Sequence, residues 1–158
     1  MNNISRGLLY TLPEIYTEIL PINYNLFFYR NNNQYMIYIA EVESELNNIK
    51  NIAIGYVSFV IDYDDSELTI QFVKSNVPRI GIGHYLILII AYIAYNQRIK
   101  KILLDDDSDL AHKGSIYQKV GCKYLNEEPY PEMVCNPLDI LNKYNEFYKK
   151  YKSKGFFI

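Results

Sequence analysis

The sequence predicts an α+β fold, in which a mixed, mostly antiparallel and twisted sheet is flanked by helices and followed by an extra C-terminal helix. Three observations support this prediction. β-Rich runs separated by short polar turns occupy the first half of the chain. A strongly apolar run of helical length follows one of them after a glycine-rich turn, and apolar and tyrosine residues spaced three or four apart lie near the end of the chain.

Size and composition fit one globular domain. The chain has 158 residues, so we expect residues 1–158 to fold as a single unit. Hydrophobic residues make up 49% and charged residues 22%, which is typical of globular rather than disordered chains. The net charge of −2 argues against a sequence-independent nucleic-acid binder, which usually has a basic face. We therefore expect no nucleic-acid partner.

The first elements are a short helix and a hairpin. Residues 12–20 predict the helix, with Thr11 as its N-cap and Pro13 in its first turn. Residues 25–30 and 34–41 are strand-like, and the three asparagines between them favour a hairpin turn.

Two further strands extend this antiparallel arrangement. They are predicted at residues 52–63 and 67–74, with an aspartate-rich turn between them. Gly55 lies inside the first of these strands, where glycine indicates a bulge or the close approach of another element.

The turn at residues 77–84, Val-Pro-Arg-Ile-Gly-Ile-Gly-His, joins the last of these strands to an apolar helix over 85–95. The first turn of a helix has backbone N–H groups without intrahelical partners and carries partial positive charge, which favours bound phosphate. Gly81 and Gly83 permit the close approach of a pyrophosphate, and Arg79 can add positive charge. Ordinary turn chemistry explains two such glycines equally well.

Other features of this region exclude some alternatives. Leu86 stands where a dinucleotide-binding turn needs a third glycine, and the Gly-Lys-Ser/Thr of a P-loop is missing. The apolar run 80–95 is interrupted by His84 and is shorter than the roughly 20 residues that a membrane-spanning helix needs. We expect a helix buried between layers and no membrane partner. The N-terminal residues lack a basic start followed by an apolar core, which favours a cytoplasmic, intracellular location.

The second half continues with a strand and a short helix. Residues 100–104 predict a strand parallel to the one before the glycine turn, because a strand–helix–strand unit of this length normally forms a right-handed crossover. The loop 105–109 is acidic, which fits helix capping and solvation and also fits a cationic substrate. Residues 111–122 then predict a short helix that ends at Gly121.

The C-terminal part predicts two strands and a long helix. The strands are expected at residues 122–125 and 132–135, and the helix at about 137–151. One stripe of this helix is either core or the surface of a homodimer, and the apolar residues 156–158 fit both roles. The stripe consists of Leu138, Leu141, Tyr144, Tyr148 and Tyr151.

Cys122 and Cys135 fall on two predicted neighbouring strands, so their spacing leaves a bridge open. Because the expected compartment is reducing, we expect two free thiols. Two cysteines and the separated His84 and His112 are too few ligands for a zinc site, so we expect no metal.

The order of a Gly-x-Gly turn that opens a helix, a short strand and a Tyr-x-x-x-Gly segment resembles the GNAT superfamily of N-acetyltransferases. The resemblance covers about residues 52–134. Pro78 stands where the family usually has Gln or Arg, so Arg79 is one position late. Leu110 stands where the family often has Asn, seven residues before Tyr117.

The resemblance implies a GNAT-like sheet, acetyl-coenzyme A as cofactor, and transfer of an acetyl group to a primary amine by direct attack. It also implies that the main chain of Phe72, Val73 and Lys74 binds the pantetheine arm. The pyrophosphate would be held by the turn residues Arg79, Ile80, Gly81, Ile82, Gly83 and His84.

Tyr117 would act as the general acid. A phenol with a pKa of about 10 can protonate a leaving thiolate whose conjugate acid has a pKa near about 8.5. With 17 tyrosines in the chain, the alternative is an ordinary half-buried aromatic residue. Among Glu67, Gln71 and Glu41, which would line the cleft, Glu67 is our choice of general base.

Three other interpretations stay open: a non-catalytic coenzyme-A-binding module, a GNAT-like fold that serves protein interaction, and an unrelated α+β protein. The acidic loop and net charge favour a cationic acceptor, such as a polyamine or aminoglycoside, although a protein amine or a longer acyl group is also compatible. The chain is rich in isoleucine, tyrosine and asparagine, which favours an A/T-rich source genome such as that of a large DNA virus.

Overall fold

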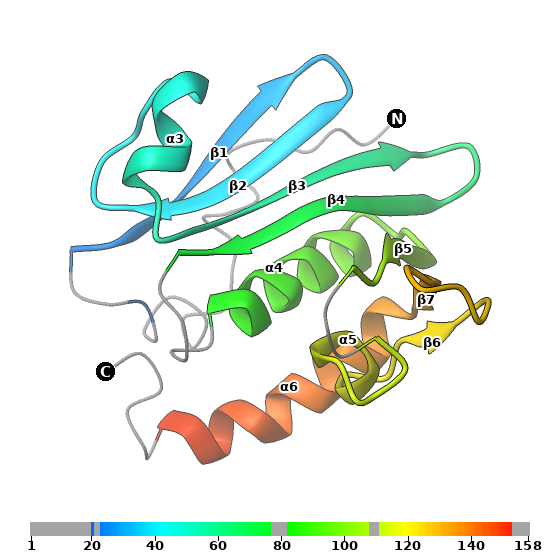
Figure 1. The fold of residues 1–158 in the computed structure, drawn as a ribbon. Helices are drawn as coiled ribbons and strands as arrows, with labels where there is room; N and C mark the ends of the chain where they lie inside the picture. The colour runs from blue at the N-terminus through cyan, green and yellow to red at the C-terminus, as the bar shows by residue number, and fades with distance from the viewer. Residues whose placement is uncertain (1–19, 21–22, 77–81, 108–110, 153–158) are drawn as a thin grey trace.

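A seven-stranded sheet in the order β1-β2-β3-β4-β5-β7-β6 lies at the centre of the described chain (Figure 1). The structure is a computed structural model that describes residue 20 and residues 23–76, 82–107 and 111–152. The strands are β1 (Asn25–Asn31), β2 (Gln34–Ala40), β3 (Gly55–Asp62), β4 (Glu67–Ser75), β5 (Lys101–Asp105), β6 (Lys123–Tyr124) and β7 (Glu132–Cys135). Among these pairs β4–β5 alone is parallel, which confirms the predicted mixed, mostly antiparallel sheet.

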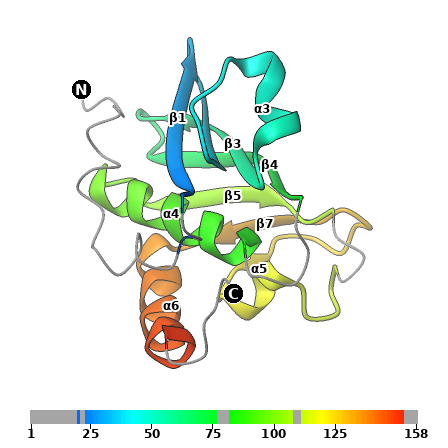
Figure 2. The same cartoon turned by 90° about the vertical axis from the view of Figure 1, so that its left-hand side faces the viewer.

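The described helices cover both faces of this sheet. They are α3 (Leu46–Ile52), α4 (Ile82–Asn96), α5 (Ile116–Lys119) and α6 (Pro137–Lys152). Helix α4 packs between the sheet and α6, and α3 lies on the opposite face (Figures 1 and 2). Alternate residues of β2 explain this arrangement, because Ile37 and Ile39 join the α4 side while Met36, Tyr38 and Ala40 join the α3 side.

Helix α4 is buried over most of its length, as its strongly apolar sequence predicts, and Tyr95 near its C-terminal end is exposed. It begins at Ile82, three residues before the predicted start. With 15 residues it is a core helix, and across the described ranges we find no helix that combines the length and apolarity needed to cross a membrane. Residues 12–19 of the helix predicted at residues 12–20 lie outside the described residues, and Leu20 lies in a bend.

Helix α3 was not predicted from the sequence. It is one seven-residue segment with a single buried residue, Ile49, and its first residue has no side-chain cap. Helix propensity and hydrophobic periodicity carry little information over a helix of two turns. The packing of Ile49 against Met36 and Tyr38, rather than the local sequence, therefore stabilises this helix.

Cys122 and Cys135 form a disulfide bond, so the expectation of two free thiols is wrong. In the antiparallel pair β6–β7, Lys123 lies opposite Val134, which places the next residues along, Cys122 and Cys135, side by side with their Cα atoms 4.4 Å apart. The prediction of free thiols was based on the expected reducing compartment. The bond instead depends on strand register, which brings the two sulfur atoms together.

Candidate functional site

The parallel strands β4 and β5 separate soon after they pair. Only Glu67, Leu68 and Thr69 of β4 lie opposite residues of β5. Beyond Thr69, β4 continues to Ser75 beside β3, and β5 continues beside β7. Within the described chain, this leaves one edge of β4 without a neighbouring strand over residues 70–75. Such an edge can hydrogen-bond an extended ligand through its main chain.

A β-bulge accounts for this separation. Ser58 of β3 pairs with Phe72 and the next residue, Phe59, pairs with Ile70, so Gln71 is the extra residue in β4. A bulge bends its strand and increases the local twist, and this one lies two residues after Thr69, the last residue that pairs with β5. The alternating sequence of β4 gives no signal for an inserted residue, and the sequence analysis missed it.

The separated edge of β4 leads toward the N-terminus of α4. Ile82, Gly83 and His84 form the first turn of this 15-residue helix, whose N–H groups and dipole favour an anion. The resemblance predicts these three residues as part of a pyrophosphate site, and the structure places them at the N-terminus of α4. The other residues predicted for it, Arg79, Ile80 and Gly81, lie outside the described residues.

Gly55 allows this helix end to approach the sheet. A Cβ atom on Gly55 would collide with the Ile82 side chain and would lie 3.1 Å from the carbonyl oxygen of Lys74 and 3.3 Å from the Leu86 side chain. The predicted close approach is thus confirmed, and the approaching element is the first turn of α4.

His84 links this first turn to the C-terminal helix. Its Nδ1 lies 2.8 Å from the hydroxyl oxygen of Tyr144, a residue of α6 that is only 1% exposed. Burial, together with the positive charge of Lys119, lowers the pKa of His84 below its ordinary value, so the imidazole is neutral at pH 7. Burial and the neighbouring Tyr117 raise the pKa of Tyr144, which keeps the hydroxyl protonated.

Tyr117, on α5, lies near Tyr144. It is partly buried and packs against the main core. Burial raises the pKa of Tyr117 to about 12, with smaller contributions from the negative charges of Asp107 and Asp106. The side chain is therefore a neutral phenol at physiological pH and can donate a proton. Tyr117 of α5 lies close enough to Tyr144 of α6 to raise the pKa of Tyr144, and Tyr144 in turn lies at hydrogen-bond distance from His84 of α4. The three helices therefore meet around these side chains.

A buried hydrogen-bond network positions the segment that leads into α5. The carboxylate of Asp106, fully buried after β5, accepts a hydrogen bond from the Tyr124 hydroxyl at 2.8 Å. The same hydroxyl oxygen accepts the backbone N–H of His112 at 2.8 Å and lies 3.2 Å from Ser115 Oγ. Ser115 in turn accepts the N–H of Gln118, as a helix N-cap does. Asp106 thus has a structural role that the acidic composition of its loop did not indicate.

Glu67 lies far from this cluster along the sheet. It is the first residue of β4 and pairs with Lys101, the first residue of β5. Helix α4 instead follows the C-terminal end of β4, and Tyr117 on α5 follows the C-terminal end of β5. The structure therefore does not bring Glu67 together with Tyr117 or His84.

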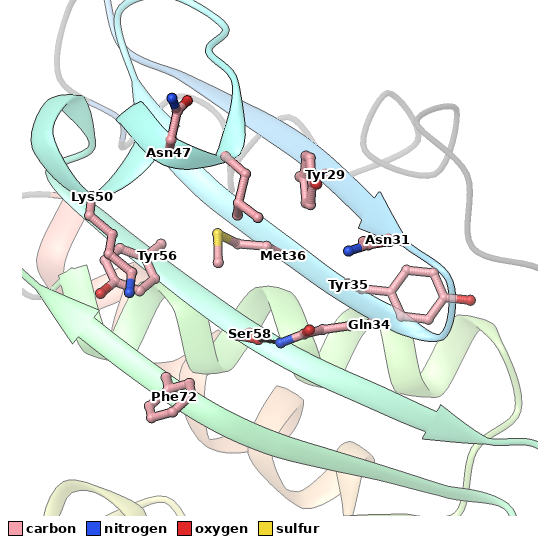
Figure 3. A pocket seen from close by; sticks show the side chains of 11 residues that line it. Tyr29, Asn31, Gln34, Tyr35, Met36, Asn47, Lys50, Tyr56, Ser58 and Phe72 are labelled. Atoms are coloured by element: carbon pink, nitrogen blue, oxygen red, sulfur yellow. Dashed lines mark hydrogen bonds between the residues drawn. The ribbon is translucent and has the colours of Figure 1, made fainter.

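A pocket of about 540 Å³ lies on the other face of the sheet, beneath α3 (Figure 3). Its floor is a triangle of hydrogen bonds in which the Gln34 amide donates to Ser58 Oγ (3.0 Å) and to Gln71 Oε1 (2.9 Å), and Ser58 Oγ donates to Gln71 Oε1 (3.1 Å). Phe72, the residue after the bulge, lines this pocket and also belongs to the separated part of β4, so the pocket adjoins the separated edge at this strand. The residues that line it are Tyr29, Asn31, Gln34, Tyr35, Met36, Leu46, Asn47, Lys50, Tyr56, Ser58 and Phe72.

The sequence analysis did not anticipate this pocket or the role of Tyr144. Tyr144 was assigned only to an apolar stripe, since its partner His84 is 60 positions away. The pocket depends on α3 and on the bulge, neither of which has a clear sequence signal.

The comparisons with known proteins show the fold. No protein-family model matches the chain, and no curated protein matches it. Among solved structures, an aminoglycoside 6'-acetyltransferase type Ii is 18% identical, with 68% of this chain and 71% of that chain covered and a TM-score of 0.50. The spermidine/spermine N-acetyltransferase of Vibrio cholerae is 14% identical (72% and 71% covered, TM-score 0.53). A GNAT-family acetyltransferase of Staphylococcus aureus is 12% identical (68% and 70%, TM-score 0.51). The chain therefore has the fold of GNAT acetyltransferases.

Proposed function

We propose that this protein is an acetyl-coenzyme A-dependent N-acetyltransferase that transfers an acetyl group to a primary amine by direct attack. The observation that carries the proposal is the separated edge of β4 over residues 70–75, which contains the Gln71 bulge and leads toward the N-terminus of α4. The shared fold supports it, because the neighbours compared above are named as acetyltransferases of aminoglycosides and of spermidine and spermine.

The residues present fit acetyl-coenzyme A. The main chain of Phe72, Val73 and Lys74 lies on the separated edge and would bind the pantetheine arm. The helix N-terminus would hold the pyrophosphate through Ile82, Gly83 and His84, together with Arg79, Ile80 and Gly81 of the preceding turn. When bound, the cofactor supplies an activated thioester carbonyl.

Tyr117 is the proposed general acid. Its raised pKa keeps the hydroxyl protonated, so it can donate its proton to the departing thiolate. The hydrogen bond between His84 and Tyr144 fixes the first turn of α4 against α6 and so keeps the anion site beside Tyr117. Glu67 receives no role, since it lies at the opposite end of β4.

The pocket beneath α3 is the proposed acceptor site. Phe72 belongs both to its lining and to the separated edge, so an amine held there would approach a thioester carbonyl from the face of the sheet that carries α3. This arrangement keeps the acceptor and the cofactor in separate binding sites, as direct attack requires.

Calorimetric titration tests the cofactor site. Acetyl-coenzyme A is expected to bind at micromolar concentration, whereas NAD and ATP do not. Gly83→Glu places bulk and negative charge in the first turn of α4 and should abolish binding. Asn142→Glu adds the same charge to the exposed surface of α6 and should not.

Turnover tests the catalytic part of the proposal. Tyr117→Phe should keep cofactor affinity and lower kcat by about 10²-fold or more, because only the proton donor is lost. Cofactor binding without turnover of any amine would instead favour a non-catalytic coenzyme-A-binding module. A folded protein that binds no acetyl-coenzyme A would contradict the proposed function.

A further inference from the structure

The charge of the pocket beneath α3 is the first guide to its ligand. Of the described residues that line the pocket, Lys50 alone carries a charge, and no carboxylate lines it. Figure 3 shows the Lys50 side chain extending from α3 toward the sheet near Tyr56. A polycation bound here would meet a like charge without a compensating one, whereas a carboxylate would gain an ion pair.

Aromatic side chains form much of the wall. Tyr29 and Tyr56 are partly buried, and Phe72 is 64% exposed although it lies in the middle of the sheet. Flat apolar side chains around a cavity of this size favour a ligand with an aromatic body, through apolar burial and ring contacts. Met36 adds an adaptable apolar surface between them.

The amides of the floor can orient a polar group. In the triangle of Gln34, Ser58 and Gln71, both donors of the Gln34 amide are used. Among the described residues, the Gln34 carbonyl oxygen and the Gln71 amide nitrogen have no hydrogen-bond partner. The amine of a ligand can donate a hydrogen bond to the Gln34 carbonyl oxygen, beside the bulge residue Gln71. Neutral amides hold an amine without stabilising its protonated form as a carboxylate would, which favours the nucleophilic free base.

We propose that the pocket binds a small aromatic amine that carries a carboxylate, as an aromatic α-amino acid does, and that this ligand is the acetyl acceptor. The role of this ligand as acetyl acceptor rests on the proposed function, whereas the preference of the pocket for such a ligand does not. Lys50 pairs with the carboxylate, the aromatic wall covers the ring, and the amide floor directs the amine toward the bulge. Polyamines and aminoglycosides are excluded as the favoured acceptors, in contrast to the expectation from the acidic loop.

Direct binding tests this assignment without acetyl transfer. We would measure dissociation constants of the full chain for L-phenylalanine, 2-phenylethylamine and spermidine by ligand-observed NMR. Phenylalanine should bind about fivefold more tightly than phenylethylamine, which lacks only the carboxylate, and spermidine should bind most weakly. In the acetylation assay the three amines should follow the same order of kcat/KM.

Variants identify the residues responsible. Lys50→Glu should remove the preference for phenylalanine over phenylethylamine, and the milder Lys50→Gln should reduce it. Phe72→Ala should weaken both aromatic ligands to the same extent. Lys123→Glu makes the same charge change on β6, at the opposite edge of the sheet, and should alter nothing.

The possible results separate the two proposals. Tighter binding of spermidine, an unchanged preference in Lys50→Glu, or no aromatic ligand bound by the folded protein would overturn the pocket assignment. If acetyl-coenzyme A binds while phenylalanine does not, the pocket assignment alone fails. If phenylalanine binds in a Lys50-dependent way but acetyl-coenzyme A does not, the proposed function fails and the binding preference stands.

Discussion

The proton of Tyr117 should be retained across the whole working pH range. Its pKa is raised to about 12, and a group that acts as an acid loses activity only as the pH rises through its pKa. We therefore expect kcat/KM to rise with pH as the acceptor amine loses its proton, without a falling limb below about pH 10. Steady-state rates between pH 6 and 10 test this. A falling limb near pH 8 to 9 that disappears in Tyr117→Phe would contradict it.

The partly buried His84 should make the fold sensitive to acid. Its pKa is lowered in the folded state, so the unfolded chain binds more protons around and below the ordinary value of 6.5. The contribution of a neutral His84 to stability is then present above that value and is lost as the pH falls below it. We expect the free energy of unfolding in urea to decrease from pH 7.5 to pH 5.5.

Two histidine variants check that this effect belongs to His84. His84→Gln removes the titrating group and should flatten the pH dependence. His112→Gln changes the other histidine of the chain and should leave it as in the parent protein. Equal pH dependence in all three proteins would assign the effect to other groups.

At the level of single residues, local pattern in the sequence proposes candidates but does not show which partners meet. The Gly-x-Gly turn and Tyr117 were proposed because each belongs to such a pattern. The hydrogen bond of His84 with Tyr144 and the pairing of Tyr124 with Asp106 join residues that are far apart in the chain. Such contacts depend on tertiary packing, which local pattern does not encode.

The elements that position the proposed cofactor site depend on Gly55. Gly55→Ala would force its Cβ atom against Ile82 and displace the first turn of α4. We expect a loss of about 1–3 kcal/mol in unfolding free energy and weaker acetyl-coenzyme A binding. Chemical denaturation and calorimetry measure the two effects.

The cause can be separated by a second substitution. Ile82→Ala removes the side chain that the new methyl group meets, so Gly55→Ala/Ile82→Ala should be less destabilised than the sum of the two single variants. Strict additivity would show that Gly55 is needed for another reason, such as the carbonyl oxygen of Lys74, which would lie 3.1 Å from a Cβ atom at this position.

Among the elements, those with strong periodicity were predicted and those formed by packing were not. The described strands and the apolar α4 lie close to their expected positions because alternation and uniform apolarity are visible locally. The bulge at Gln71 and helix α3 have no such signal, and together they create the pocket. The pairing of Cys122 with Cys135 likewise follows from the register of β6 and β7.

For the whole molecule, a main core that joins the sheet to its helical layer predicts one unfolding transition. The main core cluster extends from Phe28 on β1 through α4 to Tyr144 on α6, so no part of the described sheet has a core of its own on that side. The chain has no tryptophan and 17 tyrosines, so near-ultraviolet circular dichroism reports tyrosine packing and the far-ultraviolet signal reports secondary structure. The two signals should change at the same urea concentration.

Ligand binding should shift this single transition as a unit. Acetyl-coenzyme A at about 100 times its dissociation constant should raise the unfolding free energy by about 2.7 kcal/mol, because it binds only the folded chain. Since the proposed cofactor site lies across β4 and α4 within the main core, both spectroscopic signals should shift equally. A shift seen by one signal alone would mean that the sheet and the helical layer unfold separately, and the prediction of one domain would then be wrong.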